Sequence, residues 1–289
     1  MKSRSILLVA LVLMISVNTF AQGDPVVVAE ARRRIAQPPK YTRLENAVVR
    51  VPMVGTKTLP LVNVTLNGQG PYKFLVDTGA NVTILQMRVA DDLNLPVLRP
   101  GDKSKLLALR SMEMNGAHFE DVVVGARSWN EDIDGIIGFG IFANLLFTMD
   151  YPKQQLILRK GELPATNGKD IFTYGLDARC PTLEVVIGNE RLNILVDTGA
   201  RQAMVITNSI ASKLKFAGPL TPGPTLSTFH TDASASRLGK LSDELSMGIH
   251  KVAGMKVHVW DDVPVLGSDL FKDFVLTFDQ KNLRLRIGV

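Results

Sequence analysis

The chain has 289 residues, 46% of them hydrophobic, which is enough for a sizeable core and, as a soft prior, indicates about two domains. The formal net charge is +5, but the one basic run, Arg32-Arg33-Arg34, has no interleaved aromatic residues, so nothing indicates a nucleic-acid partner. Cys180 is the only cysteine, which excludes an intramolecular disulfide.

The first 21 residues have the pattern of an export signal. Lys2 and Arg4 precede an uncharged apolar stretch over residues 6–17, and residues 19–21 offer small side chains for cleavage before Gln22. The stretch is too short to span a bilayer comfortably. We therefore expect a signal peptide over residues 1–21, a periplasmic or secreted protein and no stable membrane insertion. A retained anchor is the alternative.

Residues 22–45 predict an N-terminal helix or linker. Asp24 suits the N-cap, Pro25 the first helical position, and Pro38-Pro39 would end the helix. The simplest interpretation of its three arginines is a solvated face. An inhibitory pro-segment that pairs with an acidic site, or contact with an anionic membrane, are the alternatives.

Short strands are predicted along most of the remaining chain. Leu61–Leu66 alternates between apolar and polar residues and ends in Asn67-Gly68, a strong hairpin signal, after which residues 71–76 return as a strand. The second half repeats this arrangement with strands over residues 183–187 and 192–196.

Further hairpins and a few helical pieces complete the prediction. Residues 112–114 and 119–124 form a hairpin candidate, and its counterpart is 244–249 followed by 254–259. The helical pieces are residues 86–93, residues 209–214 and the turns after Gly138 and Gly267. This pattern predicts a mostly β protein in two lobes.

One tetrapeptide occurs twice, as Asp77-Thr78-Gly79-Ala80 and, 120 positions later, as Asp197-Thr198-Gly199-Ala200. Each copy follows an apolar run and is followed by two apolar residues and a glycine, at Ile136-Ile137-Gly138 and Val265-Leu266-Gly267. In each copy an aspartate comes 12 positions after that glycine. Two copies of one unit explain this, so we expect a duplicated lobe, with lobe 1 over residues 46–160 and lobe 2 over residues 161–289.

The repeat supplies two matched carboxyl groups, which together can activate a water molecule. Two carboxyl groups about 3 Å apart cannot both ionise easily, so one keeps a proton while the other acts as a base toward a water molecule. We predict Asp77 and Asp197 as this catalytic pair. The neighbouring loop residues are predicted to support it, and the apolar pairs with their glycines are predicted to form an apolar floor: Thr78, Gly79, Ala80, Thr198, Gly199, Ala200, Ile136, Ile137, Gly138, Val265, Leu266 and Gly267. The alternative is that each Asp-Thr-Gly is an ordinary turn signal.

The residues quoted above resemble those of the aspartic proteases, specifically the retropepsin-like group and its bacterial exported relatives, over about residues 46–289. Retropepsins are homodimers, whereas here two subunits look fused in one chain, as in pepsins. The resemblance implies two tandem β-barrel lobes of the acid-protease fold with an active-site cleft between them. It also implies an aspartic endopeptidase acting on polypeptides, with no cofactor and no metal. Because one chain supplies both aspartates, we expect a monomer with two pseudo-symmetric lobes.

The sequence departs from the retropepsin pattern at an Asp/Arg pair of that family. Asn81 and Phe139 stand at those positions in lobe 1, and Arg201 and Ser268, followed by Asp269, in lobe 2. Our hypothesis is a charge-reversed Arg201–Asp269 pair. A catalytically silent, bilobed peptide-binding protein of the same fold is the alternative function.

Other candidate features are weaker. The covering loop that this family places over its substrate is predicted in residues 221–236 rather than in residues 99–102, with an ordinary surface loop as the alternative. The four histidines have no metal-ligand spacing, and no Gly-x-Ser-x-Gly motif of serine hydrolases occurs.

Overall fold

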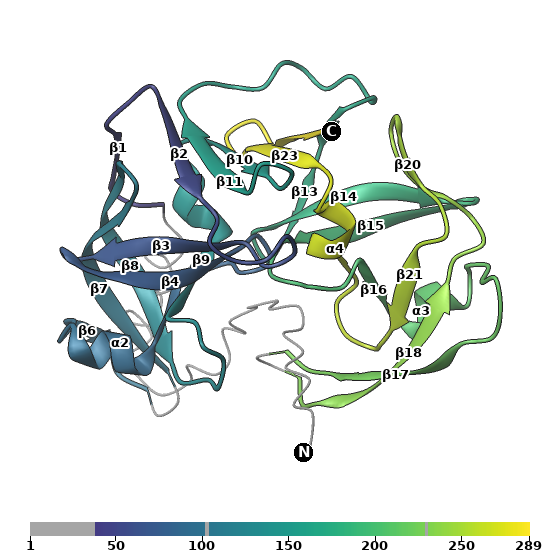
Figure 1. Cartoon of the computed structure of the whole chain (residues 1–289), viewed down its shortest axis with the longest axis horizontal. Helices are drawn as coiled ribbons and strands as arrows, with labels where there is room; N and C mark the ends of the chain where they lie inside the picture. Colours follow the sequence, from purple (N-terminus) through teal and green to yellow (C-terminus); the bar gives the residue numbers. More distant parts are fainter. Residues whose placement is uncertain (1–37, 102–103, 229–230) are drawn as a thin grey trace.

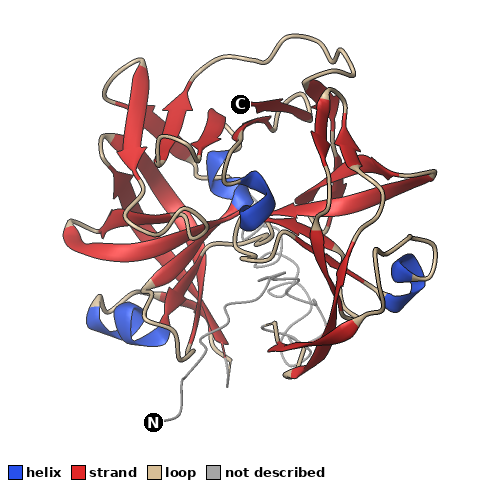
Figure 2. Cartoon of the chain, turned by 45° about the vertical axis from the view of Figure 1, so that its right-hand side comes forward, coloured by secondary structure: helices blue, strands red, loops and turns tan. Residues whose placement is uncertain are grey.

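The computed structural model describes residues 38–101, 104–228 and 231–289. Two lobes lie side by side, and a third sheet lies across their junction (Figure 1). Strands dominate, and the helices are short (Figure 2). The predicted signal peptide and the helix expected from Asp24 lie outside the described residues. Within these residues, no helix is long and apolar enough to cross a bilayer.

The first lobe is a closed β-barrel with two additional strands. Closure occurs because the long strand β7 pairs with β3 at one end and with β8 along its length. Inward-facing apolar side chains alternate along these strands and fill the barrel. The strands are β1 (Tyr41–Leu44), β3 (Leu61–Leu66), β4 (Gln69–Asp77), β5 (Ile84–Gln86), β6 (Val97–Arg99), β7 (Ser104–Met114), β8 (Ala117–Arg127) and β9 (Gly135–Gly138).

The second lobe repeats this order, but as an open half-barrel. The counterpart of β7 is divided by residues 241–244 into β18, which pairs with β21, and β19, which pairs with β14. The strands are β13 (Gly175–Asp177), β14 (Cys180–Ile187), β15 (Glu190–Asp197), β16 (Met204–Ile206), β17 (Thr221–Leu226), β18 (Ser234–Lys240), β19 (Leu245–Met247), β20 (His250–Val252), β21 (Lys256–Val259) and β22 (Val265–Gly267).

The third sheet takes three strands from each half of the sequence. At its centre β10 (Leu146–Asp150) pairs antiparallel with β23 (Val275–Asp279), the corresponding strand of the other repeat. Thr148 and Thr277 face each other there, and their hydroxyl oxygens are 2.9 Å apart. The sheet is completed by β2 (Val48–Pro52), β11 (Gln155–Arg159), β12 (Ile171–Thr173) and β24 (Arg284–Gly288). Two lobes that share one sheet have a common core beneath it.

Most predicted elements are present, with two corrections. Tyr41–Leu44, placed by the sequence in the N-terminal helix or linker, is the strand β1, and it pairs with β8 of the first lobe. The predicted pairing of residues 244–249 with 254–259 does not form, because Gly248, with φ +59°, turns the chain early into the short β19–β20 hairpin. The helices are α2 (Met87–Asp92), η2 (Phe139–Phe142), α3 (Asn208–Ala211) and α4 (Ser268–Phe271).

Candidate active site

The two Asp-Thr-Gly-Ala loops meet at the junction of the lobes and are joined by four reciprocal hydrogen bonds. The Thr78 hydroxyl donates to the Val196 carbonyl (2.6 Å) and accepts from the Thr198 backbone N–H (3.1 Å). The Thr198 hydroxyl donates to the Val76 carbonyl (2.8 Å) and accepts from the Thr78 N–H (3.0 Å). Both threonines are completely buried. Each loop is therefore held in place by the loop of the other repeat.

This bracing brings Asp77 and Asp197 together, both with no exposed surface. The Oδ1 atom of Asp77 accepts the N–H of Gly79 (2.8 Å), and that of Asp197 accepts the N–H groups of Gly199 (2.9 Å) and Ala200 (3.0 Å). The Oδ2 atoms receive no hydrogen bond from an N–H or O–H donor of the described residues. A direct hydrogen bond between the two carboxyl groups would require a proton on one of them.

Burial is the largest cause that raises the pKa of both carboxyl groups above their usual range. The charge of Asp197 and the hydrogen bond to it raise the pKa of Asp77 further. The same hydrogen bond, together with the amides of Gly199 and Ala200, favours the ionised form of Asp197. The pair therefore titrates as one unit, and it retains a proton to higher pH than a free aspartate does.

The glycines of the motif are required by close approach of the loops. A Cβ atom on Gly79 would lie 2.5 Å from Cγ of Asp197, and one on Gly199 would lie 2.5 Å from Cγ of Asp77. A larger residue would displace the opposite carboxyl group, so these glycines allow the two aspartates to come within reach of each other.

The apolar-apolar-Gly segments lie directly beside the two carboxyl loops. Strand β9 pairs in parallel with β4, so that Gly138 lies opposite Asp77, and β22 pairs in parallel with β15, so that Gly267 lies opposite Asp197. The four apolar side chains are buried, as a floor requires: Ile136, Ile137, Val265 and Leu266. The structure thus brings together all of the site residues that the sequence singled out.

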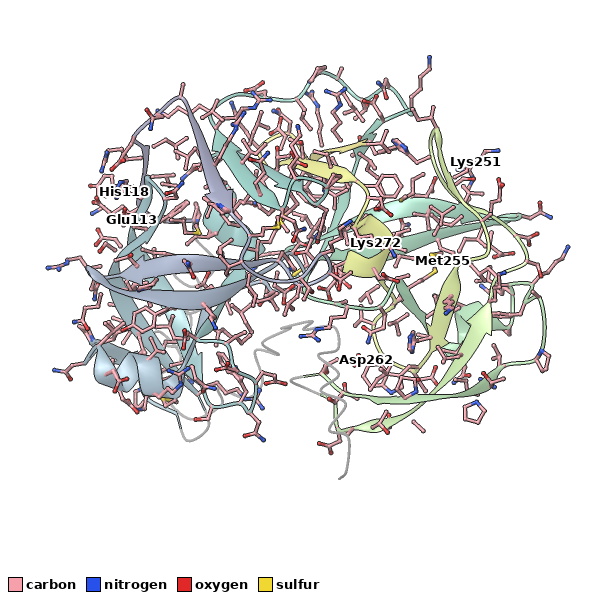
Figure 3. All side chains as sticks on the ribbon, in the orientation of Figure 1. Glu113, His118, Lys251, Met255, Asp262 and Lys272 are labelled. Carbon is pink, nitrogen blue, oxygen red and sulfur yellow. The ribbon has the colours of Figure 1, made fainter. Side chains whose placement is uncertain are left out.

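The hypothesis of an Arg201–Asp269 ion pair is wrong. Asp269 pairs with Lys272 of the same segment at 3.0 Å, near the middle of the molecule (Figure 3). Arg201 is instead attracted by Glu131 of the first lobe, and burial lowers its pKa. The causes that shift the pKa of Asp197 are burial, Asp77 and the backbone amides of Ala200 and Gly199.

Two further residues contact the loops, and the sequence analysis gave neither this role. The thiol of Cys180, at the start of β14, donates to the Gly79 carbonyl at 3.2 Å. The Ser268 hydroxyl lies 2.7 Å from the carbonyl oxygens of both Thr58 and Ala200, so it links lobe 1 to the second loop. Two features of the sequence could have indicated these contacts. Cys180 comes directly before Pro181 of a strand, and Ser268 comes directly after Gly267 of the second apolar-apolar-Gly segment.

Two further features considered in the sequence are the covering loop and a metal site. In the predicted covering segment, β17 and β18 form a hairpin whose free end points toward the first lobe (Figure 1), although residues 229–230 are not described. Among the described residues, no group of three or more histidines, cysteines and acidic residues could hold a metal ion.

Comparison with known proteins agrees with this architecture. Residues 62–144 match the family of gag-polyprotein putative aspartyl proteases. The aspartic proteinase from Irpex lacteus has a similar structure, with a TM-score of 0.56 and 13% sequence identity over 84% of this chain and 97% of that one. No curated protein matches the sequence.

At 13% identity, the structural likeness establishes the fold, which is the bilobed fold of an aspartic proteinase. The family match covers the first Asp-Thr-Gly-Ala motif and the Ile136-Ile137-Gly138 segment beside it. The family match therefore concerns the first lobe, and the likeness of fold concerns most of the chain.

Proposed function

We propose that this protein is an aspartic endopeptidase and that Asp77 and Asp197 form its catalytic pair. The observation that carries the proposal is the buried pair itself, whose Oδ2 atoms have no donor among the described residues while Oδ1 of each is fixed by backbone N–H groups. A purely structural carboxylate at a buried turn would be expected to have its oxygens hydrogen-bonded.

In the proposed reaction Asp197 is the base and Asp77 the acid. Asp197 takes a proton from a water molecule, whose oxygen attacks the carbonyl carbon of the scissile peptide bond, while Asp77 donates its proton to the carbonyl oxygen. The tetrahedral intermediate then collapses: one of its hydroxyl groups returns a proton to Asp77, the C–N bond breaks, and the leaving amine takes up the proton that Asp197 acquired. The products are a new carboxyl end and a new amino end. The closely packed loops keep the two carboxyl groups in fixed positions throughout.

The test is cleavage of an unstructured protein by chain lacking residues 1–21, from pH 3 to pH 8, with and without a pepstatin-type inhibitor. We expect Asp77→Asn and Asp197→Asn each to lower kcat by at least about a thousandfold, because neither carboxyl group works alone. Asp92→Asn, at an exposed helix position, is the matched control and should keep full activity. Since both pKa values are raised, the acid limb of the profile should lie above the usual aspartate pKa of about 3.9.

Other outcomes would decide against the proposal. Cleavage that survives either substitution would exclude a shared pair. Absence of cleavage at every pH, with saturable peptide binding retained in both variants, would favour the catalytically silent peptide-binding protein.

A further inference from the structure

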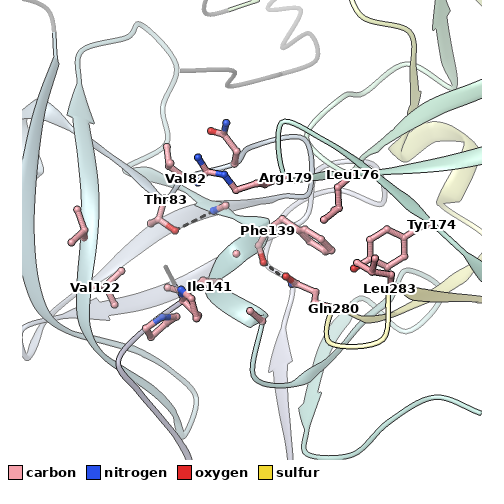
Figure 4. A pocket seen from close by; sticks show the side chains of 17 residues that line it. Val82, Thr83, Val122, Phe139, Ile141, Tyr174, Leu176, Arg179, Gln280 and Leu283 are labelled. Atoms are coloured by element: carbon pink, nitrogen blue, oxygen red, sulfur yellow. Dashed lines mark hydrogen bonds between the residues drawn. The ribbon is translucent and has the colours of Figure 1, made fainter. Parts of the chain in front are cut away.

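A pocket of about 190 Å³ lies at the junction of the lobes, beside the first Asp-Thr-Gly-Ala loop (Figure 4). Apolar side chains of both lobes line it: Val82, Val122, Phe139, Ile141, Leu176 and Leu283. Its volume is below the roughly 300–1,000 Å³ of sites that enclose a drug-sized ligand. The pocket therefore suits one short apolar group rather than a long segment of chain.

Three polar groups at this pocket have no partner among the residues that the structure describes. Within that part of the chain, the buried Tyr174 hydroxyl and Oδ1 of Asn81 have no hydrogen bond. Burial is the main cause that raises the pKa of Tyr174, so its hydroxyl keeps its proton and remains a donor. The Arg179 guanidinium forms no ion pair with a described residue. Figure 4 shows Arg179 and Tyr174 on two sides of the pocket.

The backbone at Arg179 adopts a conformation that its side chain disfavours. Strands β13 and β14 are joined by a two-residue turn, Ala178 and Arg179, with φ of 44° and 72°. Such turns favour Asn-Gly, because glycine has no Cβ atom and asparagine tolerates positive φ, whereas most other residues are strained there. Strain of this kind is most often found where a side chain has a function. Here the turn is what places Arg179 at the pocket.

We propose that this pocket binds an apolar carboxylate, and specifically the carboxyl end of a peptide with an apolar last residue. The Arg179 guanidinium would form an ion pair with the carboxylate, and the Tyr174 hydroxyl would donate to one of the carboxylate oxygens. The side-chain Oδ1 of Asn81 would accept the peptide N–H. The apolar walls would hold the side chain. The choice of a peptide rests on the proposed function, because an endopeptidase generates new carboxyl ends.

The pocket has two structural connections to the candidate catalytic pair. Asn81 lies four residues after Asp77 in the same loop. Cys180, the neighbour of Arg179, donates its thiol hydrogen to the Gly79 carbonyl at 3.2 Å. A peptide end bound at Arg179 would therefore contact the loop that holds Asp77, and we expect it to act as a product inhibitor.

The test measures binding directly, so it does not depend on catalysis. Asp77→Asn protein lacking residues 1–21 is titrated calorimetrically with N-acetyl-leucine, with isovalerate and with the uncharged N-acetyl-leucinamide. We expect millimolar binding of N-acetyl-leucine and none of the amide. Arg179→Asn, which suits the left-handed backbone, should weaken binding about tenfold or more, and Arg179→Lys should weaken it less. Arg191→Asn, on the exposed β15 hairpin, is the matched control.

Each outcome has a defined meaning. Tighter binding of N-acetyl-leucine than of isovalerate supports the peptide end, and equal binding of both supports an apolar carboxylate but assigns a free acid. Absence of saturable binding, or equal binding by the Arg179→Asn and Arg191→Asn proteins, overturns the proposal. Circular dichroism of each variant confirms folding. Binding of N-acetyl-leucine, together with absence of cleavage by the wild-type protein at every pH, would contradict only the proposed function.

Discussion

At the scale of single residues, the candidate site holds two carboxyl groups in fixed positions, in a buried environment that disfavours their ionised forms. Asp77 and Asp197 are buried, no cationic side chain of the described residues is a cause of their pKa shifts, and burial is the main cause that raises both pKa values. Such a pair is held in place by its surroundings, here the four Thr78 and Thr198 bonds. A site of this kind is expected to lower the stability of the folded state.

The first prediction concerns this lowered stability. A carboxyl group with a raised pKa binds its proton more tightly in the folded than in the unfolded chain. Its contribution is therefore fully favourable below the unfolded pKa of about 3.9 and is lost as pH rises through the folded pKa, by up to ~1.4 kcal/mol per pH unit. We expect Asp77→Asn to increase the free energy of unfolding relative to wild type at pH 7, and to have little effect at pH 3.5. Each kcal/mol would raise the Tm by about 2–4 °C.

Urea unfolding of both proteins at the two pH values is the measurement. Asp92→Asn, at an exposed position, should show no difference that depends on pH. An Asp77→Asn protein less stable than wild type at pH 7 would mean that the carboxylate is stabilised by contacts rather than strained by burial.

At the scale of elements, the sequence was sufficient wherever a local pattern determines the structure. Alternation and Asn67-Gly68 defined the β3–β4 hairpin, in which both turn residues have positive φ as such a turn requires. The repeated tetrapeptide predicted that Asp77 and Asp197 would lie together. The sequence did not predict Cys180 or Ser268 as contacts of the loops, because these contacts join segments 101 and 68 positions apart. The sequence left open whether each barrel closes, because a bend within a strand leaves little local signal.

The second prediction concerns the strands at the centre of the shared sheet. The hydroxyl groups of Thr148 on β10 and Thr277 on β23 are buried and hydrogen-bonded to each other. Thr148→Val alone should lower the free energy of unfolding by about 1–3 kcal/mol, because it leaves the Thr277 hydroxyl buried without a partner. The double valine variant should recover most of this loss, since both polar groups are then removed.

Urea unfolding of the two single variants, the double variant and wild type completes the cycle. Thr173→Val, at an exposed position of β12, should change the stability by less than about 0.5 kcal/mol. Losses that simply add in the double variant would show that the two hydroxyl groups are not coupled.

At the scale of the whole molecule, the shared sheet makes the lobes interdependent. Neither half of the sequence contains all the strands of this sheet, and the core beneath it takes residues from both halves. Separation of the lobes would expose the facing strands β10 and β23 along their full length. The two lobes should therefore unfold together.

The third prediction tests this cooperativity. The chain has two tryptophans, Trp129 in the first lobe and Trp260 in the second. We expect the fluorescence transition of Trp129→Phe, which reports lobe 2, to coincide with its own circular dichroism transition in urea, and the same for Trp260→Phe. Comparison within each variant removes the effect of the substitution on stability. Fluorescence and circular dichroism midpoints that differ within either variant would mean that the lobes unfold as separate units.

The covalent fusion of the two repeats affects how the pair behaves at low protein concentration and how mutations change it. A pair of carboxyl groups contributed by two separate chains is lost when the concentration falls below the dissociation constant of the assembly, whereas a link within one chain gives the partner loop a constant, high effective concentration. Each molecule of this protein therefore keeps both loops together however dilute it becomes. Since the loops are encoded separately, one mutation alters Asp77 or Asp197 alone, and the two can acquire different environments.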